Sequence, residues 1–301
     1  MDNHQVDIVL PYHNGSKFIE AQLDSIQKAE LRSETKLHVL VIDDGSRADE
    51  FEFLTTICAR FTNVTIYRNE ANLGCIKSFE RGLSLSSAQY VMTSDQDDIW
   101  MPDKIQRSLD LLRSAERTEA ALVFTDLCVV DQNLDVLRTR MLALENFQQS
   151  RDKYRILFQN IVAGCTIIVN RKLLEMALPF PSGIPMHDHW LAVCAAFGGR
   201  IEMLNEPMVL YRQHDNNLVG SPMPRLLYRI MTPRASLSHL HQSLRAKSEL
   251  ADRLAERMEA SGRQRDVERV RQVSLAFRQR TPKRTWLSLL RSAFSNLAPS
   301  D

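Results

Sequence analysis

Three carboxylates occupy four consecutive positions in Asp95-Gln96-Asp97-Asp98, directly after a short apolar run at residues 90–93. Carboxylates this close together repel one another and carry no hydrogen-bond donors of their own, so solvent or a cation must neutralise them. At a strand end that faces a ligand crevice, a divalent metal is the economical explanation. The alternative is a solvated acidic turn that caps the following helix.

Two other polar segments follow apolar runs in the first half of the chain. In DDGS at residues 43–46, a carboxylate can accept the imide N–H of a uracil or thymine ring; a plain Asx turn is the alternative. In NLG at residues 72–74, a loop leads into a helix that carries Lys77. The N-terminus of that helix and the ammonium of Lys77 could bind a phosphate there. The alternative is a capped helix with solvated basic residues.

The second half of the chain holds two more candidate segments. MHDHW at residues 186–190 places Asp188 ahead of an apolar helix, where a carboxylate with a raised pKa could act as a general base. YRQHDNN at residues 211–217 places Arg212 and His214 after a predicted strand, where they could hold an anionic leaving group. The alternatives are a helix N-cap beside a packed tryptophan and a polar linker.

Strands and helices alternate in the pattern that would bring these segments together. We predict strands at residues 6–10, 37–42, 64–67 and 90–93, then at 121–125, 165–169, 200–204 and 208–211. We predict helices at residues 16–28, 49–60, 75–85, 103–114 and 191–197. This order indicates an α/β fold with a mainly parallel sheet, in which ligands bind outside the carboxyl ends of the strands. The polar segments that follow the first four predicted strands are PYHNGS, DDGS, RNEANLG and SDQDDIW.

Taken in order, VLPYHNG, VIDDGS, NLGCIKSF, SDQDDIWMPDK, MHDHW and YRQHDNN resemble family 2 glycosyltransferases of the GT-A fold, from about residue 6 to about residue 220. The last three are most similar to bacterial rhamnosyltransferases of surface polysaccharide assembly. The resemblance implies inverting transfer of a sugar to a hydroxyl of a glycan or lipid-linked acceptor. L-rhamnose from dTDP-rhamnose is the first expectation for the donor, and a UDP-hexose is the second.

The resemblance also implies roles for individual residues. Asp95 and Asp97 would hold Mg²⁺ or Mn²⁺ on the donor pyrophosphate, and Asp188 would be the catalytic base. The residues that would bind the nucleotide are Pro11, Tyr12, Asn14, Asp43, Asp44, Lys77 and Asp95. Arg212 and His214 would face the diphosphate leaving group. The rhamnosyl-like subset often has His-Asp-Trp at the base, whereas here His189 stands between Asp188 and Trp190.

Composition narrows the class of protein. A chain with 44% hydrophobic and 25% charged residues is not collagen-like, coiled-coil or wholly disordered. The five cysteines form no CxxC pair, which predicts reduced core residues. The absence of a basic leader and of a stretch of ~20 apolar residues predicts a cytoplasmic protein. No nucleic-acid partner is expected.

The chain divides by charge. We predict a GT-A domain over residues 1–221, with a nucleotide-binding half at 1–118 and an acceptor half at 119–221, and a helical basic region at 222–301. That region has 16 basic and 7 acidic residues, against 22 and 30 in the rest. Its segment KRTWLSLLRSAFSNL has two interpretations: peripheral docking on the inner face of the cytoplasmic membrane, or a helical arm that packs on the body or on a second subunit.

Other classes of function fit the sequence less well. A nucleotidyltransferase would be expected to have a Gly-rich basic loop after the first strand, and PYHNGSK is a poor version of one. A non-enzymatic nucleotide-sugar-binding scaffold would be credible if the metal or base carboxylates were missing. A dinucleotide-dependent dehydrogenase is disfavoured because no GxGxxG opens the first helix.

Overall fold

The computed structural model describes residues 4–116, 119–141, 152–214, 233–260, 262 and 266–278. The chain forms two compact units. The first contains Met1–Phe180 and Met186–Gly220, and the second contains Pro181–Pro185 and Ser221–Asp301. The division into functional halves remains a prediction.

Within the described residues, one nine-stranded sheet has the order β3-β2-β1-β4-β8-β6-β9-β5, and β7 pairs with β6. The strands are β1 (His4–Tyr12), β2 (Thr35–Asp43), β3 (Val64–Arg68), β4 (Tyr90–Thr93), β5 (Ile99–Trp100), β6 (Ala120–Val130), β7 (Val136–Arg138), β8 (Ile167–Asn170) and β9 (Gly199–Arg212). Strands β1 to β4 are parallel, β8 joins β4 and β6 antiparallel, and β9 runs parallel to β6. The carboxyl ends of β1, β2, β3 and β4 therefore meet at one edge of the sheet.

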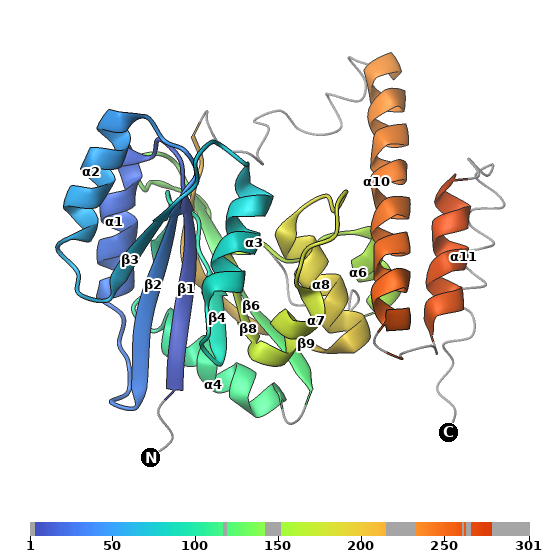
Figure 1. Ribbon diagram of the computed structural model, residues 1–301, viewed down its shortest axis with the longest axis horizontal. Coiled ribbons are helices and arrows are strands. Elements are labelled where there is room, and N and C mark those ends of the chain that lie inside the picture. Colours follow the sequence, from blue (N-terminus) through green and yellow to red (C-terminus); the bar gives the residue numbers. More distant parts are fainter. Residues whose placement is uncertain are drawn as a thin grey trace. The chain divides into compact units, whose positions relative to one another are not determined.

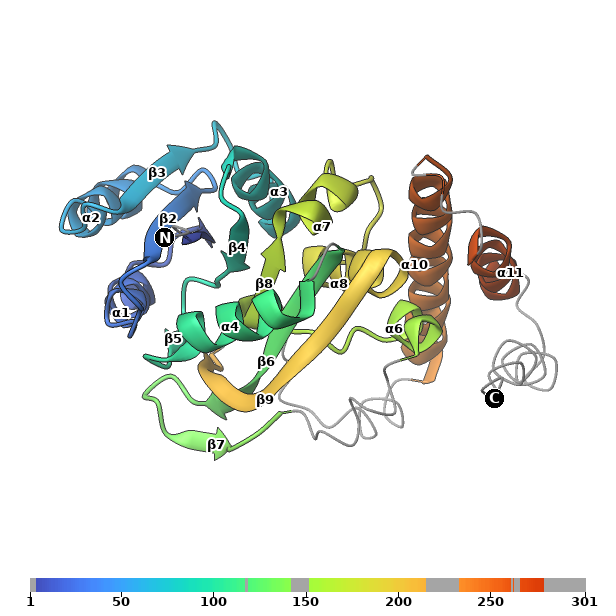
Figure 2. The ribbon, with the colours of Figure 1, turned by 90° about the horizontal axis from the view of Figure 1, so that it is seen from below.

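Helices cover both faces of the sheet (Figures 1 and 2). Helices α1 (Ser16–Gln27), α2 (Ala48–Cys58) and α4 (Lys104–Glu116) lie on one face, and α3 (Cys75–Leu85), α7 (Arg171–Ala177) and α8 (His187–Gly198) lie on the other. Helix α6 (Lys153–Phe158) packs on α8, and a 3₁₀ turn (Gly164–Thr166) precedes β8. Strands β4, β6 and β8 are buried along their whole length, which explains why their sequences are nearly continuous apolar runs.

Successive side chains of β1 point to opposite faces of the sheet. Ile8 and Leu10 belong to the core beneath α1, α2 and α4. Val9 points the other way, toward α3, where a Cβ at Gly82 would lie 2.3 Å from its Cγ1. Glycine at position 82 therefore lets α3 approach the sheet closely.

Strand β9 merges two predicted strands into one. Residues 200–204 and 208–211 were expected to be separate, because Asn205-Glu206-Pro207 interrupts the apolar pattern. The strand instead continues through a shift of register opposite Asp126. Such a bulge accommodates Pro207, which has no N–H for the ladder.

The second unit contains two helices, α10 (Pro233–Ala260) and α11 (Val267–Arg278), which pack against each other in antiparallel orientation. Leu250, Leu254 and Val270 are buried in it, and the hydroxyls of Ser248 and Ser274 lie 2.8 Å apart. No helix of the described ranges combines the length and apolar character needed to cross a membrane. The segment KRTWLSLLRSAFSNL lies outside the described residues.

Candidate active site

Loops after the parallel strands are joined by hydrogen bonds that continue beyond the strand ends. The backbone N–H of Ser94 donates to the carbonyl of Val9 (3.0 Å), and that of Asp44 donates to the carbonyl of Tyr12 (2.7 Å). Gln96 reaches the first loop as well, since its Oε1 accepts from the N–H of His13 at 2.9 Å. The loop of residues 94–98, called the carboxylate loop below, is thus fixed against the loop of residues 13–15 after β1.

The end of β1 and the loop after it contain three residues predicted to bind the nucleotide, Pro11, Tyr12 and Asn14. Pro11 lies near the end of β1, opposite Ile42 of β2. The Tyr12 hydroxyl donates to Glu50 Oε2 at 2.7 Å, and its side chain is fully buried. Asn14 has a φ of +47°, which few residues other than glycine adopt, and its N–H donates to Ser46 Oγ at 3.0 Å. This positive φ turns the chain back toward the loop after β2.

The two carboxylates after β2 are engaged within the protein. Asp43 accepts from the N–H of Ser46 at 3.2 Å and pairs with Arg68 Nε at 3.0 Å. Asp44 accepts from the backbone N–H groups of Leu73 (2.8 Å) and Gly74 (2.9 Å). Asp44 therefore orders the loop that leads into α3, and its predicted contact with the nucleotide remains a prediction.

Lys77 lies on the first turns of α3, and its ammonium donates to Glu80 Oε2 at 2.6 Å. The lysine side chain is 57% exposed. A surface pair of this kind contributes ~0–1 kcal/mol and separates readily. The predicted role of Lys77 toward phosphate remains a prediction.

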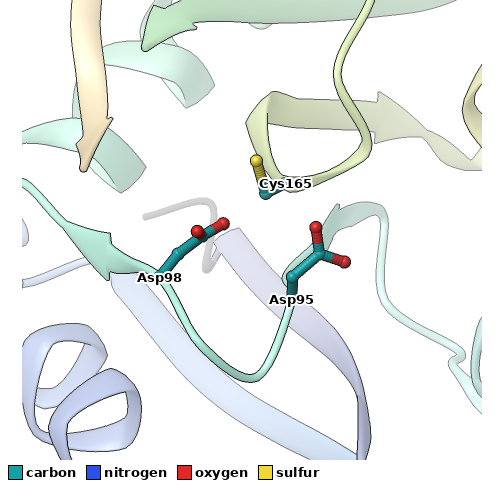
Figure 3. A group of neighbouring side chains, drawn as sticks. All are labelled: Asp95, Asp98 and Cys165. Carbon is teal, nitrogen blue, oxygen red and sulfur yellow. The ribbon is translucent and has the colours of Figure 1, made fainter. Parts of the chain in front are cut away.

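Asp95 and Asp98 point toward the thiol of Cys165, which comes from the turn before β8 (Figure 3). One ligand atom from each of the three residues lies within 4.8 Å of the others. Burial and the charges of Asp97 and Asp188 raise the pKa of Asp95, and burial with the charges of Asp95 and Asp97 raises that of Asp98. Burial and mutual repulsion therefore make ionisation of these carboxyl groups unfavourable unless a positive charge offsets it.

Lys104 is fully buried next to this cluster, at the start of α4. Its ammonium lies 3.7 Å from the ring centroid of Trp100. Burial lowers the pKa of Lys104 to about 7, against the opposing influence of Cys165 and Asp98. Sequence reasoning missed this residue, because a lysine in PDK at a helix start is usually a solvated charge.

Asp97 contacts residues at and just after the end of β9. His214 Nε2 lies 2.8 Å from Asp97 Oδ2. Arg212 Nε donates to the carbonyl of Asp97 at 2.8 Å, and its Nη1 donates to the carbonyl of Gln132 at 2.6 Å. The N–H of Arg212 donates to Asp98 Oδ1 at 3.1 Å. Arg212 thus holds the carboxylate loop to β9, and its predicted contact with a diphosphate remains a prediction.

Three residues at the start of α8 each contact a different helix. His187 stacks on Phe79 of α3, with ring centroids 3.7 Å apart. His189 Nε2 lies 2.7 Å from the carbonyl of Ile156 in α6, and Trp190 Nε1 donates to the carbonyl of Ala177 in α7 at 3.0 Å. The extra His189 therefore anchors α6. Asp188 lies between His187 and His189, and its charge raises the pKa of Asp95.

Asp188 is 8% exposed, and burial raises its pKa to about 6 against hydrogen bonds that lower it. The N–H of His189 donates to Asp188 Oδ1 at 2.5 Å, and Asn160 and Gly164 also act to lower this pKa. Sequence reasoning missed Asn160 and Gly164, since a single amide and a glycine in an irregular segment carry no periodic signal. A carboxylate with this pKa is suited to general base catalysis near neutral pH.

The donor atoms near the carboxylate loop fit a hard divalent cation. Carboxylate oxygens are the ligands that Mg²⁺ and Mn²⁺ prefer, and Asp95 and Asp98 bring theirs within 4.8 Å of each other, so the structure groups Asp95 with Asp98. The predicted second ligand, Asp97, lies beside His214, whose imidazole also suits Mn²⁺. Such a cation would offset the repulsion among these carboxylates and so lower the raised pKa of Asp95 and Asp98.

Comparison with known proteins shows the family of the chain. The sequence model of glycosyl transferase family 2 matches residues 7–176, more than half of the chain, and the chain belongs to this family. A dTDP-rhamnosyl transferase, RfbG of Shigella flexneri, is 25% identical over 230 residues that cover 69% of this chain and 73% of that protein. An uncharacterised glycosyltransferase of a Nostoc species is 21% identical over 223 residues, which cover 71% and 66%.

Solved structures show the same fold. TarS residues 1–349 of S. aureus, in complex with UDP-GlcNAc, has a TM-score of 0.59 at 15% identity, with 92% of each chain covered. The mannosyltransferase PcManGT of Pyrobaculum calidifontis, in complex with GDP-Man and Mn²⁺, has a TM-score of 0.53 at 17% identity, with 98% and 88% covered. The GT-A fold predicted from the sequence is confirmed.

Proposed function

We propose that the chain is an inverting, metal-dependent glycosyltransferase of cell-surface polysaccharide synthesis. L-rhamnose from dTDP-rhamnose is the first candidate for the transferred sugar, and a hexose from a UDP-hexose is the second. The acceptor is a hydroxyl of a glycan or of a lipid-linked glycan. The observation that carries the proposal is the Asp95–Asp98 loop facing Asp188 at the carboxyl edge of the parallel strands.

The similarity to a dTDP-rhamnosyl transferase supports rhamnose as the first candidate. The UDP-GlcNAc of TarS and the GDP-Man of PcManGT support a nucleotide-sugar donor of some kind. The Mn²⁺ in PcManGT supports a divalent cation. Asp95 and Asp97 would hold it, together with His214. Bound there, a cation would neutralise negative charge on the donor diphosphate.

Asp188 performs the proton transfer in this proposal. Its carboxylate accepts the proton of the acceptor hydroxyl as that oxygen bonds to the anomeric carbon, and the bond to the nucleoside diphosphate breaks. The sugar passes through an oxocarbenium-like transition state, as in glycoside hydrolysis. One displacement inverts the anomeric configuration.

Release of nucleoside diphosphate from dTDP-rhamnose and from UDP-hexoses tests this function. Purified protein is incubated with each donor, Mn²⁺ and lipid-linked glycans from bacterial membranes, and Asp188→Asn serves as the inactive control. We expect acceptor-dependent dTDP release and a product of inverted configuration. Nucleotide binding without transfer from any donor would support a scaffold instead.

A further inference from the structure

A buried polar network on α1 contacts the chain at both ends of the carboxylate loop. Gln22 Nε2 donates to Ser94 Oγ at 2.7 Å, and Ser94 is the first residue of the loop. Ser25, one turn further along α1, accepts from the backbone N–H of Trp100 at 3.0 Å. Trp100 is the second residue of β5, which begins directly after Asp98. Both ends of the loop are therefore hydrogen-bonded to the same helix.

The two contacts belong to one network, because Gln22 and Ser25 also bond to each other. The Ser25 hydroxyl donates to the main-chain carbonyl of Gln22 at 2.8 Å and approaches Gln22 Oε1 at 3.1 Å. The Gln22 amide thus uses its oxygen toward Ser25 and its nitrogen toward Ser94. Ser94 Oγ donates in turn to the carbonyl of Asp95 at 3.1 Å, so the network reaches the first carboxylate residue of the loop.

The network lies in the core of the first unit. The side chains of Gln22, Ser25, Ser94 and Trp100 are all buried. The neighbouring buried positions of α1 are mostly apolar: Ile19, Leu23 and Ile26. A glutamine among them costs free energy unless its amide is hydrogen-bonded, whereas an apolar residue of similar length would pack there without that requirement. Gln22 is therefore better explained by its hydrogen bonds than by its packing.

Other elements hold the middle of the carboxylate loop. Gln96 Oε1 accepts from the N–H of His13, and Arg212 donates to the carbonyl of Asp97. A short loop with both ends and its middle fixed has few conformations open to it, so it can keep carboxylates that repel one another close together. Hydrogen bonds from residues behind a metal site orient its ligands in the same way.

We propose that Gln22 and Ser25 are positioning residues that hold the two ends of the carboxylate loop and so keep its carboxylates placed for one divalent cation. The proposal rests on the proposed function, in which this loop binds the cation of the donor site. Neither residue has to touch the cation or the substrate, since both act through the residues to which they are hydrogen-bonded.

The test uses three uncharged substitutions in the full chain. Gln22→Met removes the amide and keeps a side chain of similar length, and Ser25→Ala removes only a hydroxyl. Gln106→Met is the matched control, because Gln106 is also a buried glutamine on a helix that packs on the same face of the sheet. Its Oε1 accepts from the hydroxyl of Thr35 at 3.1 Å, and Thr35 begins β2 at the edge opposite to the carboxylate loop.

Two readouts separate positioning from general loss of stability. Titration of Mn²⁺ followed by electron paramagnetic resonance gives the affinity for the cation. Hydrogen exchange followed by NMR in the metal-free chain gives the protection of the Trp100 N–H. Thermal unfolding shows how much stability Gln22→Met and Gln106→Met each lose.

We expect Mn²⁺ affinity to fall about tenfold in Gln22→Met and in Ser25→Ala, at the lower end of the range for residues that orient metal ligands. The Trp100 N–H should exchange about tenfold faster in Gln22→Met than in Gln106→Met. Gln106→Met should leave Mn²⁺ affinity unchanged. Combining Gln22→Met with Ser94→Ala should weaken Mn²⁺ binding no further than the more damaging single substitution, because both remove the same contact.

Equal Mn²⁺ affinity in Gln22→Met and Gln106→Met would overturn the proposal, whether both were unchanged or both reduced. If Gln22→Met does not fold, Ser94→Ala removes the other partner of the same contact and takes its place in the comparison. Failure of the wild-type chain to bind Mn²⁺ would reject the metal dependence of the proposed function. The exchange of Trp100 in the metal-free chain would then still decide whether Gln22 holds the loop, since equal rates in Gln22→Met and Gln106→Met would contradict it.

Discussion

His214 Nε2 lies 2.8 Å from Asp97 Oδ2, although 117 positions separate the two residues in the chain. The imidazole also stacks on Phe18 of α1, with ring centroids 4.8 Å apart. Phe18 in turn lies under the guanidinium of Arg212 at 4.8 Å. The end of β9 is thus held against the carboxylate loop through aromatic and polar contacts together.

Asp97→Asn and His214→Gln should each weaken Mn²⁺ binding, because both would remove a ligand atom from the same edge of the site. We expect losses of about 10-fold to 100-fold in affinity, the range for residues that hold or orient a metal. Titration of Mn²⁺ followed by electron paramagnetic resonance measures this. His38→Gln, near Thr65 of β3, is the control. Equal affinity in His214→Gln and the wild type would remove His214 from the metal site.

Asp188→Asn should reduce kcat about 10²-fold to 10⁴-fold, the usual contribution of a positioned general base. Donor affinity should change less than twofold, because the amide has nearly the same shape and the first-half loops are untouched. Calorimetric titration with the donor separates the two effects. A large loss of donor affinity would instead place Asp188 in the nucleotide site.

Transfer should depend on pH with an acid limb near pH 6. Asp188 must be ionised to accept a proton, and burial raises its pKa from 3.8 to about 6, so the rate falls as pH drops through that value. The measurement is kcat/KM between pH 5 and 9 at saturating Mn²⁺. A limb near pH 4 would mean that the catalytic base is a solvent-exposed carboxylate and therefore not the buried Asp188.

Arg212→Gln should destabilise the first unit by about 2 kcal/mol or more, because the buried guanidinium donates to the carbonyls of Asp97 and Gln132. Thermal unfolding measures the effect. Arg32→Gln is the matched control, since Arg32 forms an exposed pair with Asp110 that contributes ~0–1 kcal/mol. If Arg212→Gln instead left stability unchanged and lowered kcat, the role of Arg212 toward the diphosphate would gain support.

The strands and helices of the first half could be predicted from periodicity alone. The predicted helix at residues 75–85 coincides with α3, and the predicted strand at residues 90–93 coincides with β4. Clear apolar faces and glycine or polar breaks define both. Helices α6 and α7 were not predicted, because six or seven residues hold too few turns for a periodic signal and gain their stability from packing on α8 and the sheet.

Residues of the candidate site could be predicted only where they form a short sequence motif. The rule that ligands bind at carboxyl ends of parallel strands was enough to group the first-half loops. It could not show that Asp44 accepts hydrogen bonds from the backbone N–H groups of Leu73 and Gly74, or that Lys104 is buried. Those facts depend on which loops pack together.

Calorimetric titration with dTDP, UDP, GDP and ADP, each with Mn²⁺ and again with EDTA, tests the central claim most directly. We predict that dTDP or UDP binds with Mn²⁺, that EDTA abolishes this binding, and that Asp95→Asn abolishes it as well. The preferred nucleotide would choose between the two proposed donors. If none of the four nucleotides bound in a metal-dependent way, the assignment of the carboxylate loop as a metal-assisted donor site would be contradicted.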